Sequence, residues 1–315
     1  MNLDTLPLLS LQSEPAALAR DLGSSFEQFG FALVSDHELD PALVEQAWAM
    51  TEAFFALPEA EKRAYHLAGQ GGARGYTPFG TEVAKGAAAH DLKEFWHIGR
   101  DLPAGHPLSP SMPPNVWPAC PAGFRETFTA LYAELDRVGA AILSRIAVWL
   151  GLDADWFDPA IGHGNSVLRL LHYPPVVNSE SVDSIGAIRA GAHEDINLIT
   201  LLLGAEEAGL ELLTSDGHWI PASPPEGALV VNIGDMLQRM TNHVLPSTTH
   251  RVRNPEGARA GYSRYSMPFF LHLRSDCLIE TLPGCISAGN PDRYPEPILA
   301  DDYLQERLRE IGLKR

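Results

Sequence analysis

The fold is decided by the segment AGAHEDINLITLLL, residues 190–203, in which a polar His-Glu-Asp tripeptide leads into an apolar run. Residues two apart at the start of a strand point to the same side, so His193 and Asp195 can converge on one cation. Glu194 lies between them and is expected to point away. The run INLITLLL (196–203) has the length and composition of a strand. The segment therefore indicates a metal-binding pair at the entrance to a β core.

Short β-rich runs occupy most of the chain after residue 164. They are SVLRLLHY (166–173), INLITLLL (196–203), GLELL (209–213), ALVVNI (228–233), STTHRVR (247–253) and GYSRYSMPFF (261–270). Turn signals such as Asp216-Gly217 and Pro255-Glu256-Gly257 fall between them. Strands at this spacing are typical of a sandwich or barrel, so we expect a β core at 165–272.

The regions on both sides of this core are predicted to be mainly helical. Apolar residues recur every three or four positions in 14–31, 41–58 and 121–150, as in amphipathic helices, and a further helix is expected at 304–313. A strand is expected at 30–34. The stretch 69–114 is rich in Gly and Pro and is predicted to be a long ordered loop or lid.

The predicted fold class is therefore mainly β with flanking helices (α+β). We expect one structural unit with three regions: a helical region with a long loop at 1–164, the β core at 165–272 and a C-terminal extension at 273–315. A chain of 315 residues that is 45% hydrophobic can bury a core of this size.

The charge balance argues against two classes of partner. The chain has 23 Lys and Arg against 40 Asp and Glu, a formal charge of −17, which repels phosphate backbones and anionic membranes. We therefore expect no nucleic-acid and no membrane partner. The same field disfavours small anions unless an Arg or Lys reverses it locally, so any anion site has to be found residue by residue.

The cysteines and the N-terminus predict a cytoplasmic protein. Cys120, Cys277 and Cys285 are few, odd in number and widely spaced, which fits neither a disulfide framework nor a zinc knuckle. The first residues lack the features of a secretion signal, and no apolar stretch is long enough to span a membrane. Nothing in the sequence indicates an oligomeric state.

A third metal ligand is available in STTHRVR, where His250 lies in a β-rich run that a sandwich can bring beside the first pair. Two imidazoles and one carboxylate on one face leave other coordination positions open for substrate and dioxygen. The chain has 12 histidines, so a His-x-Asp pair can also arise by chance. A further signal supports the site: Arg264 and Ser266 share one face of a later strand, where the Arg can bind a carboxylate through two parallel bonds.

The ordered set HED (193–195), NIGDMLQRMTN (232–242), STTHRV (247–252) and RYS (264–266) resembles the Fe(II)- and 2-oxoglutarate-dependent dioxygenases of the isopenicillin N synthase-like group. Upstream segments resemble the family's N-terminal half: FGFALVSDHELD (29–40), AFFALPEAEKRAY (53–65), RGYTPFGTE (74–82) and DLKEFWHIG (91–99). The resemblance thus covers nearly the whole chain.

The resemblance implies a jelly-roll core, a double-stranded β-helix, with Fe(II) at its mouth and 2-oxoglutarate as cosubstrate. It also implies a role for six residues: His193, Asp195 and His250 as iron ligands, Arg264 and Ser266 on the distal carboxylate of 2-oxoglutarate, and Tyr173 near the metal or the cosubstrate. The implied reaction oxidises a small-molecule substrate with dioxygen and releases succinate and carbon dioxide. Hydroxylation is the commonest outcome, and desaturation or ring closure stay open.

Three other functions are compatible with the same residues. One is an Fe(II) oxidase of the same fold that does not use 2-oxoglutarate, and another is a metal-dependent small-molecule binding protein without turnover. The third, a zinc hydrolase, would need a general base beside the metal-bound water. Glu194 is adjacent in sequence, but strand alternation should turn it away from the metal.

Several positions depart from the family pattern or suggest other roles. Leu171 stands where many members have Asn, Glu194 replaces the commoner Thr, and His243 replaces the usual Gly and is expected on the surface. Asn232, Gly234 and Asp235 are expected to shape a turn. The sequence does not identify the primary substrate, but the expected walls of its pocket are 75–82, 93–97, Arg189, Leu213 and Phe270.

Overall fold

The computed structural model describes residues 5–69, 72–81, 90–175, 188–204, 209–254 and 260–310. Three sequence expectations fall partly or wholly outside these ranges. They are the turn at Pro255-Glu256-Gly257, part of the expected lid including Glu82, and the end of the expected C-terminal helix after residue 310.

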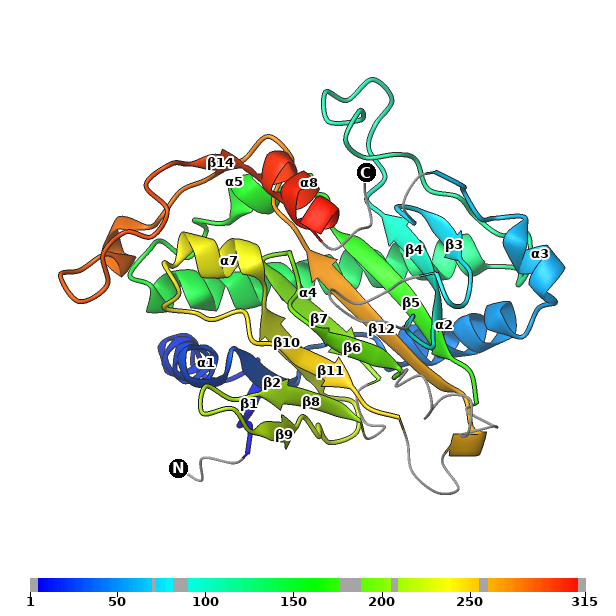
Figure 1. Ribbon diagram of the computed structural model, residues 1–315, viewed down its shortest axis with the longest axis horizontal. Helices are drawn as coiled ribbons and strands as arrows, with labels where there is room; N and C mark the ends of the chain where they lie inside the picture. The colour runs from blue at the N-terminus through cyan, green and yellow to red at the C-terminus, as the bar shows by residue number, and fades with distance from the viewer. Residues whose placement is uncertain are drawn as a thin grey trace.

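Two β-sheets form the centre of the molecule (Figure 1). The main sheet has the order β1 (Leu8–Ser10), β2 (Phe31–Ser35), β10 (Leu229–Ile233), β7 (Ile199–Leu203), β12 (Arg264–Leu271), β5 (Val167–Tyr173), β4 (Glu94–Gly99) and β3 (Gly75–Thr77). The small sheet has the order β6 (Ala190–His193), β11 (His250–Val252), β8 (Leu210–Leu213) and β9 (Trp219–Pro221). A separate pair joins β13 (Leu278–Ile279) to β14 (Ile298–Leu299). The two larger sheets form the expected jelly-roll core.

Helices cover one face of the main sheet, and α4 runs behind it in Figure 1. The helices are α1 (Pro15–Phe29), α2 (Pro41–Phe55), α3 (Glu59–Arg63), α4 (Phe124–Trp149), α5 (Asp158–Ile161), α7 (Asp235–Met240) and α8 (Ala300–Glu310), with a 3-10 turn η2 (Pro283–Cys285). The helices α1, α2, α4 and α8 agree with those expected from the apolar spacing, whereas α3, α5, α7 and η2 were not expected.

The start and end of α1 follow from local sequence. The Glu14 carboxylate accepts hydrogen bonds from the backbone N–H groups of Ala16 and Ala17, and Pro15 takes the first helical position, where no N–H is needed. The helix stops at Gly30, whose φ of 67° lies in the left-handed region that glycine adopts without strain. Strand β2 therefore begins at the next residue, Phe31.

Side-chain alternation gives the main sheet two different faces. On β5, Leu168 and Leu170 point outward and join a large core with the helices. Leu171 and Tyr173 point inward and join a second core with residues of the small sheet, such as Leu212. The space between the two sheets is therefore lined by every second residue of each strand.

The prediction of a loop throughout 69–114 is wrong, because β3 and β4 lie within it and extend the main sheet. Strand β4 pairs with the whole of β5, from Glu94 opposite His172 to Gly99 opposite Val167. All six residues of β4 are buried, so the strand shows no alternation of polar and apolar residues. Flanking Gly and Pro residues then made it look like part of a loop.

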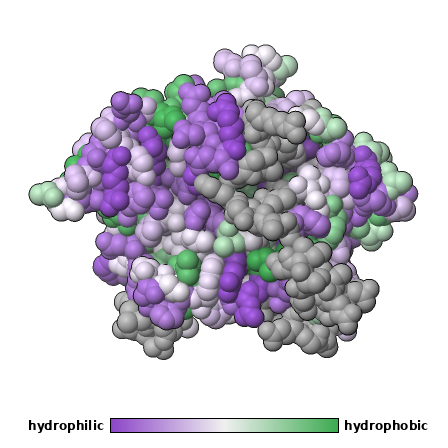
Figure 2. Space-filling view, in the orientation of Figure 1, coloured by the Kyte–Doolittle hydropathy of each residue, from purple (hydrophilic) through white to green (hydrophobic). Residues whose placement is uncertain are grey.

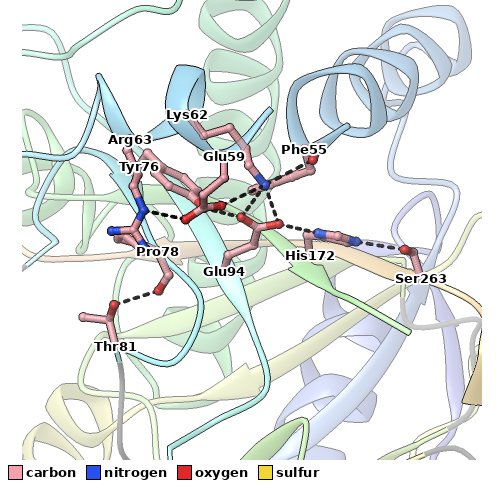
Figure 3. Close-up of polar contacts among 10 residues, drawn as sticks. All are labelled: Phe55, Glu59, Lys62, Arg63, Tyr76, Pro78, Thr81, Glu94, His172 and Ser263. Carbon is pink, nitrogen blue, oxygen red and sulfur yellow. Dashed lines mark hydrogen bonds and ion pairs between the residues drawn. The ribbon is translucent and has the colours of Figure 1, made fainter. Parts of the chain in front are cut away.

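A buried charged cluster ties the outer face of this part of the sheet to the helices (Figure 3). Lys62 Nζ lies 2.7 Å from Glu94 Oε2, and His172 Nδ1 lies 2.7 Å from Glu94 Oε1. The other ring nitrogen of His172 lies 2.9 Å from Ser263 Oγ, and the Tyr76 hydroxyl also donates to Glu94. Through these contacts α3, β3, β4, β5 and the residue that precedes β12 are held together.

One face of the molecule can be judged for its polarity. On the face shown in Figure 2 hydrophilic side chains predominate, and the hydrophobic ones appear in small separate groups. Among the described residues, no helix combines the length and the apolar character that crossing a membrane requires.

Replacing Lys62 tests how strongly the buried cluster stabilises the fold. Lys62→Met leaves the Glu94 carboxylate buried without its cation, and we expect the free energy of unfolding to fall by about 3–5 kcal/mol. Urea unfolding followed by circular dichroism measures this. The control is Arg63→Met, which removes an ion pair to Glu59 between side chains that are 56% and 49% exposed, and should cost less than about 1 kcal/mol. Equal losses in the two variants would contradict the stabilising role of the cluster.

Candidate active site

The structure brings His193, Asp195 and His250 together at the mouth of the jelly roll. His193 ends β6, His250 begins β11, and these two residues are directly paired across the small sheet. His193 Nε2 lies 4.0 Å from Asp195 Oδ1, and His250 Nε2 lies 3.9 Å from Asp195 Oδ2. One donor atom from each of the three side chains lies within 4.8 Å of the others, so the group can hold a metal ion.

Both imidazoles are oriented by backbone carbonyl groups. His193 Nδ1 lies 2.7 Å from the carbonyl of Gly191, and His250 Nδ1 lies 3.1 Å from that of Thr248. A carbonyl can only accept, so Nδ1 carries the proton and the Nε2 lone pair is directed at the site. Burial lowers the pKa of His193 to about 4, with His250 as the next cause, so this ring is neutral near pH 7 and able to bind a metal.

Two side chains of the main sheet hold the Asp195 carboxylate. Thr200 Oγ1 donates to Oδ2 at 2.5 Å and Asn232 Nδ2 donates to the same oxygen at 2.9 Å. Burial alone would raise the pKa of Asp195, but the imidazoles of His250 and His193 and these two donors lower it below its ordinary value. The carboxylate therefore stays charged, and its Oδ1 is turned toward His193.

The contact of Asn232 with Asp195 was not predicted from the sequence. Asn232 was expected only to shape a turn. Its position on β10 opposite Thr200 of β7 brings both donors to one carboxylate oxygen. Gly234 does have a structural role, because an added Cβ would lie 2.2 Å from Asn197 Oδ1. Asp235 forms an ion pair with Arg307 of α8 at 2.9 Å.

Arg264 places a cation in the interior of the protein. Arg264 is 1% exposed, and none of its Nε, Nη1 and Nη2 atoms has a hydrogen-bond partner among the described residues. It is paired with Tyr173 across β12 and β5, and its Cζ lies 5.2 Å from the centre of the Tyr173 ring. Ser266 lies two residues along on the same face and is also buried. A buried unpaired guanidinium is costly, so this arrangement fits a carboxylate supplied by a ligand.

Other expected wall residues divide between the two faces of the sheet. Lys93 is buried and pairs with Asp91 at 2.8 Å. Arg189 lies 5.8 Å from the centre of the Tyr173 ring. Arg189 and Arg264 thus lie near the same aromatic ring, whereas the charge of Lys93 is paired with Asp91. Phe95 belongs to the inner core, whereas Glu94 belongs to the outer cluster, so only part of 93–97 lines the cavity side.

The remaining expected wall residues are placed as follows. Phe270 lies on β12 directly opposite Thr200 of β7, whose hydroxyl binds Asp195. Leu213 ends β8 in the small sheet, opposite Trp219. The described part of 75–82 contains β3, which pairs with β4.

The positions that depart from the family pattern lie away from the metal-binding atoms or are apolar. Glu194 accepts a hydrogen bond from the Thr249 hydroxyl, which is consistent with its expected direction away from the metal. His243 is half-buried rather than on the open surface, where its Nε2 lies 2.6 Å from the Tyr294 hydroxyl and the two rings stack. Leu171 is buried opposite Ser266 on the inner face.

Comparison with known families identifies the class of protein. Residues 164–273 match the model of the 2OG-Fe(II) oxygenase superfamily, and residues 3–120 match that of the non-haem dioxygenase in morphine synthesis N-terminal region. The chain belongs to the 2OG-Fe(II) oxygenase superfamily. It is accordingly an Fe(II)- and 2-oxoglutarate-dependent dioxygenase.

Similar proteins agree over almost the full length of the chain. The 2-oxoglutarate-Fe(II) type oxidoreductase hxnY of Emericella nidulans is 34% identical, with 94% of this chain and 85% of the relative covered. A crystal structure of a putative 2OG-Fe(II) oxygenase family protein from Caulobacter crescentus is 54% identical with a TM-score of 0.91, covering 98% of this chain and 100% of that one. A crystal structure of a full-length Neurospora crassa protein in complex with alpha-KG and thymine is 31% identical with a TM-score of 0.85, covering 98% and 97%.

Removing a hydrogen-bond donor to Asp195 tests whether residues of the main sheet raise the affinity of the site for Fe(II). Thr200→Val deletes the hydroxyl that donates to Asp195 Oδ2 and should weaken Fe(II) binding by about 10- to 100-fold, because partners of metal ligands orient them. Anaerobic titration with Fe(II) measures the affinity. Thr51→Val is the control, since Thr51 is also buried but lies on α2 and bonds the Ala47 carbonyl. Unchanged affinity in Thr200→Val would show that the hydroxyl does not support the metal site.

Proposed function

We propose that His193, Asp195 and His250 hold the Fe(II), and that Arg264 and Ser266 bind the distal carboxylate of 2-oxoglutarate. Tyr173 lies against Arg264 and would border the cosubstrate. The observation that carries this proposal is the buried guanidinium of Arg264 on the inner face of the main sheet, across from the small sheet that bears both histidines. No residue described in the structure neutralises it through a hydrogen bond, and a carboxylate of the cosubstrate would.

We propose further that the enzyme hydroxylates a small-molecule substrate. Fe(II) with 2-oxoglutarate supplies the activation of dioxygen, with release of succinate and carbon dioxide. His193, Asp195 and His250 would hold the metal and would leave other coordination positions open for the cosubstrate and dioxygen. Arg264 and Ser266 orient the cosubstrate, so the protein selects the reaction by positioning the substrate rather than by acid or base catalysis.

Two alternatives make different products. Desaturation or ring closure removes hydrogen from the substrate, whereas hydroxylation adds one oxygen atom, and mass spectrometry of the product distinguishes them. An oxidase that does not use 2-oxoglutarate would form no succinate. A zinc hydrolase lacks support, because Glu194 is bound to Thr249.

We also propose that the protein acts in the cytoplasm, with no nucleic-acid or membrane partner, and that its regions 1–164, 165–272 and 273–315 form one structural unit. Cys120 is exposed and unpaired, and Cys277 and Cys285 are also free thiols, which suits a reducing compartment. The net charge of −17 disfavours phosphate backbones and anionic lipid surfaces.

The ligand assignment predicts that the purified protein binds one Fe(II) per chain under anaerobic conditions. His193→Ala or Asp195→Ala should remove both the metal and the activity, because a site with three protein ligands has little affinity to spare. Metal analysis and circular dichroism together separate loss of iron from loss of fold. The controls His218→Ala and His163→Ala change exposed histidines and should keep the iron. Stoichiometric iron in both ligand variants would refute the assignment.

The cosubstrate assignment predicts that Arg264→Lys weakens binding of 2-oxoglutarate while Fe(II) binding persists. Loss of a bidentate charge-assisted pair from a buried site costs on the order of 2–5 kcal/mol, and the compact ammonium of Lys cannot reproduce the planar fork. Anaerobic titration of the Fe(II) protein with 2-oxoglutarate, followed by the metal-to-ligand charge-transfer band, measures the affinity.

The control for this titration is Arg100→Lys, which alters an ion pair to Asp136 of α4, outside the cavity. Its affinity for 2-oxoglutarate should match that of the wild type. If the wild type gave no charge-transfer band, or if Arg264→Lys bound 2-oxoglutarate equally well, the assignment would fail. The oxidase that does not use 2-oxoglutarate would then be favoured, and the absence of succinate would support it.

A further inference from the structure

A second arginine, Arg169, lies on the inner face of the main sheet. It is on β5, four residues before Tyr173, and alternation along the strand gives it the same direction as Leu171 and Tyr173. Leu168 and Leu170, on either side of it, belong to the outer core with the helices. Arg169 therefore points toward the space between the two sheets, and it is half-buried there.

The guanidinium of Arg169 is held in a defined position by aromatic rings. Its Cζ lies 4.3 Å from the centre of the Phe95 ring and 5.3 Å from that of Phe270. Its Nε lies 2.5 Å from Nε2 of His97, its register partner on β4. The N–H groups of a guanidinium lie in its own plane, so any partner that they bind lies at the edge of the group.

His97 supports this position as a neutral acceptor. Its Nδ1 lies 2.6 Å from the carbonyl of Gly72, which can only accept, so Nδ1 carries the proton. The lone pair of Nε2 then receives the hydrogen bond from Arg169 Nε. The two side chains therefore pair without opposing charges, and the positive charge of Arg169 is not cancelled by His97.

Arg169 is placed to reach a substrate near the metal. Phe270, which it contacts, lies directly opposite Thr200 on β7, and the Thr200 hydroxyl binds Asp195. The proposed cosubstrate pocket is at a different place on the same face. Arg264 is paired with Tyr173, and four residues of strand separate Tyr173 from Arg169, a distance of about 13 Å.

The charge of Arg169 is not needed by the cosubstrate. Under the proposed function, one carboxylate of 2-oxoglutarate is bound by Arg264 and the other lies at the metal. Arg169 makes further contacts within the protein, which a ligand would share or exchange. In a chain of net charge −17, a cation in this position favours an anionic substrate over a neutral one.

We propose that Arg169 binds a carboxylate of the primary substrate, while Phe270 packs against the apolar part of the same molecule. The proposal rests on the proposed function, in which the metal lies at His193, Asp195 and His250. It identifies the substrate class as small organic acids and makes Arg169 a specificity-determining residue. Bidentate binding in the guanidinium plane is the geometry that a carboxylate offers and that a primary amide does not.

The test uses a library of small carboxylic acids, each matched with its primary amide, for example L-proline with L-prolinamide and phenylacetate with phenylacetamide. Calorimetry measures binding to the anaerobic protein loaded with Fe(II) and 2-oxoglutarate. We expect at least one acid to bind the wild type more tightly than its amide. Arg169→Gln should weaken binding of that acid by about 10- to 100-fold and leave the amide unchanged.

Two further variants and one titration make the outcome decisive. Arg169→Lys should weaken the acid less than Arg169→Gln does, and Arg137→Gln, on the exposed surface of α4, should behave as the wild type. Binding of 2-oxoglutarate should be retained in all three. The proposal is overturned if no acid is preferred over its amide, if Arg169→Gln keeps the preference, or if it loses 2-oxoglutarate to the same extent. A wild type without a charge-transfer band would overturn the proposed function itself, whereas a normal band with acid binding insensitive to Arg169 would overturn only this proposal.

Discussion

Side-chain alternation along β5 and β12 separates two charged environments on opposite faces of one sheet. His172 points outward to Glu94 and Ser263, while the next residue, Tyr173, points inward to Arg264. Tyr265 stacks on His172 on the outer face, between Arg264 and Ser266, which both face inward. A shift of the pairing by one residue would exchange the two faces and place Arg264 among the helices. The register of these strands therefore places Arg264 on the inner face and the cluster that contacts the helices on the outer face.

The two faces of the sheet differ in whether their buried charge is compensated within the protein. In the outer cluster the Glu94 carboxylate is compensated within the protein, since Lys62 binds both of its oxygens and the phenyl ring of Phe55 lies nearby. On the inner face the Arg264 guanidinium lacks a hydrogen-bond partner among the described residues. A fully compensated cluster stabilises the native state without a ligand, whereas an uncompensated cation gains its partner only when an anion binds. The compensated outer cluster can thus hold in place an inner face on which, under the proposed function, the cosubstrate would supply the anion that Arg264 lacks.

Candidate site residues could be proposed from the sequence where their signals are local. His193 and Asp195 are two residues apart, as are Arg264 and Ser266, and the apolar spacing of the helices also lies within one segment. The support of Asp195 by Asn232 could not be predicted in this way, because it depends on the pairing of β10 with β7. The strands β3 and β4 were missed for a related reason. Burial on both faces removes the alternation that marks a strand, and only the pairing with β5 reveals it.

The proposed metal ligands and the residues that would select a substrate depend on different strand pairings. Two of the proposed metal ligands, His193 and His250, lie on the small sheet, and the third, Asp195, is held by Thr200 of β7 and Asn232 of β10. The position of Arg169, in contrast, depends on His97 and Phe95 of β4, which comes from the N-terminal half of the chain, and on Phe270 of β12. Changes in β4 can therefore reshape the environment of Arg169 without contacting His193 or His250. Under the proposed assignments, metal binding and substrate selection would depend on different strands, which meet where Thr200 of β7 pairs with Phe270 of β12.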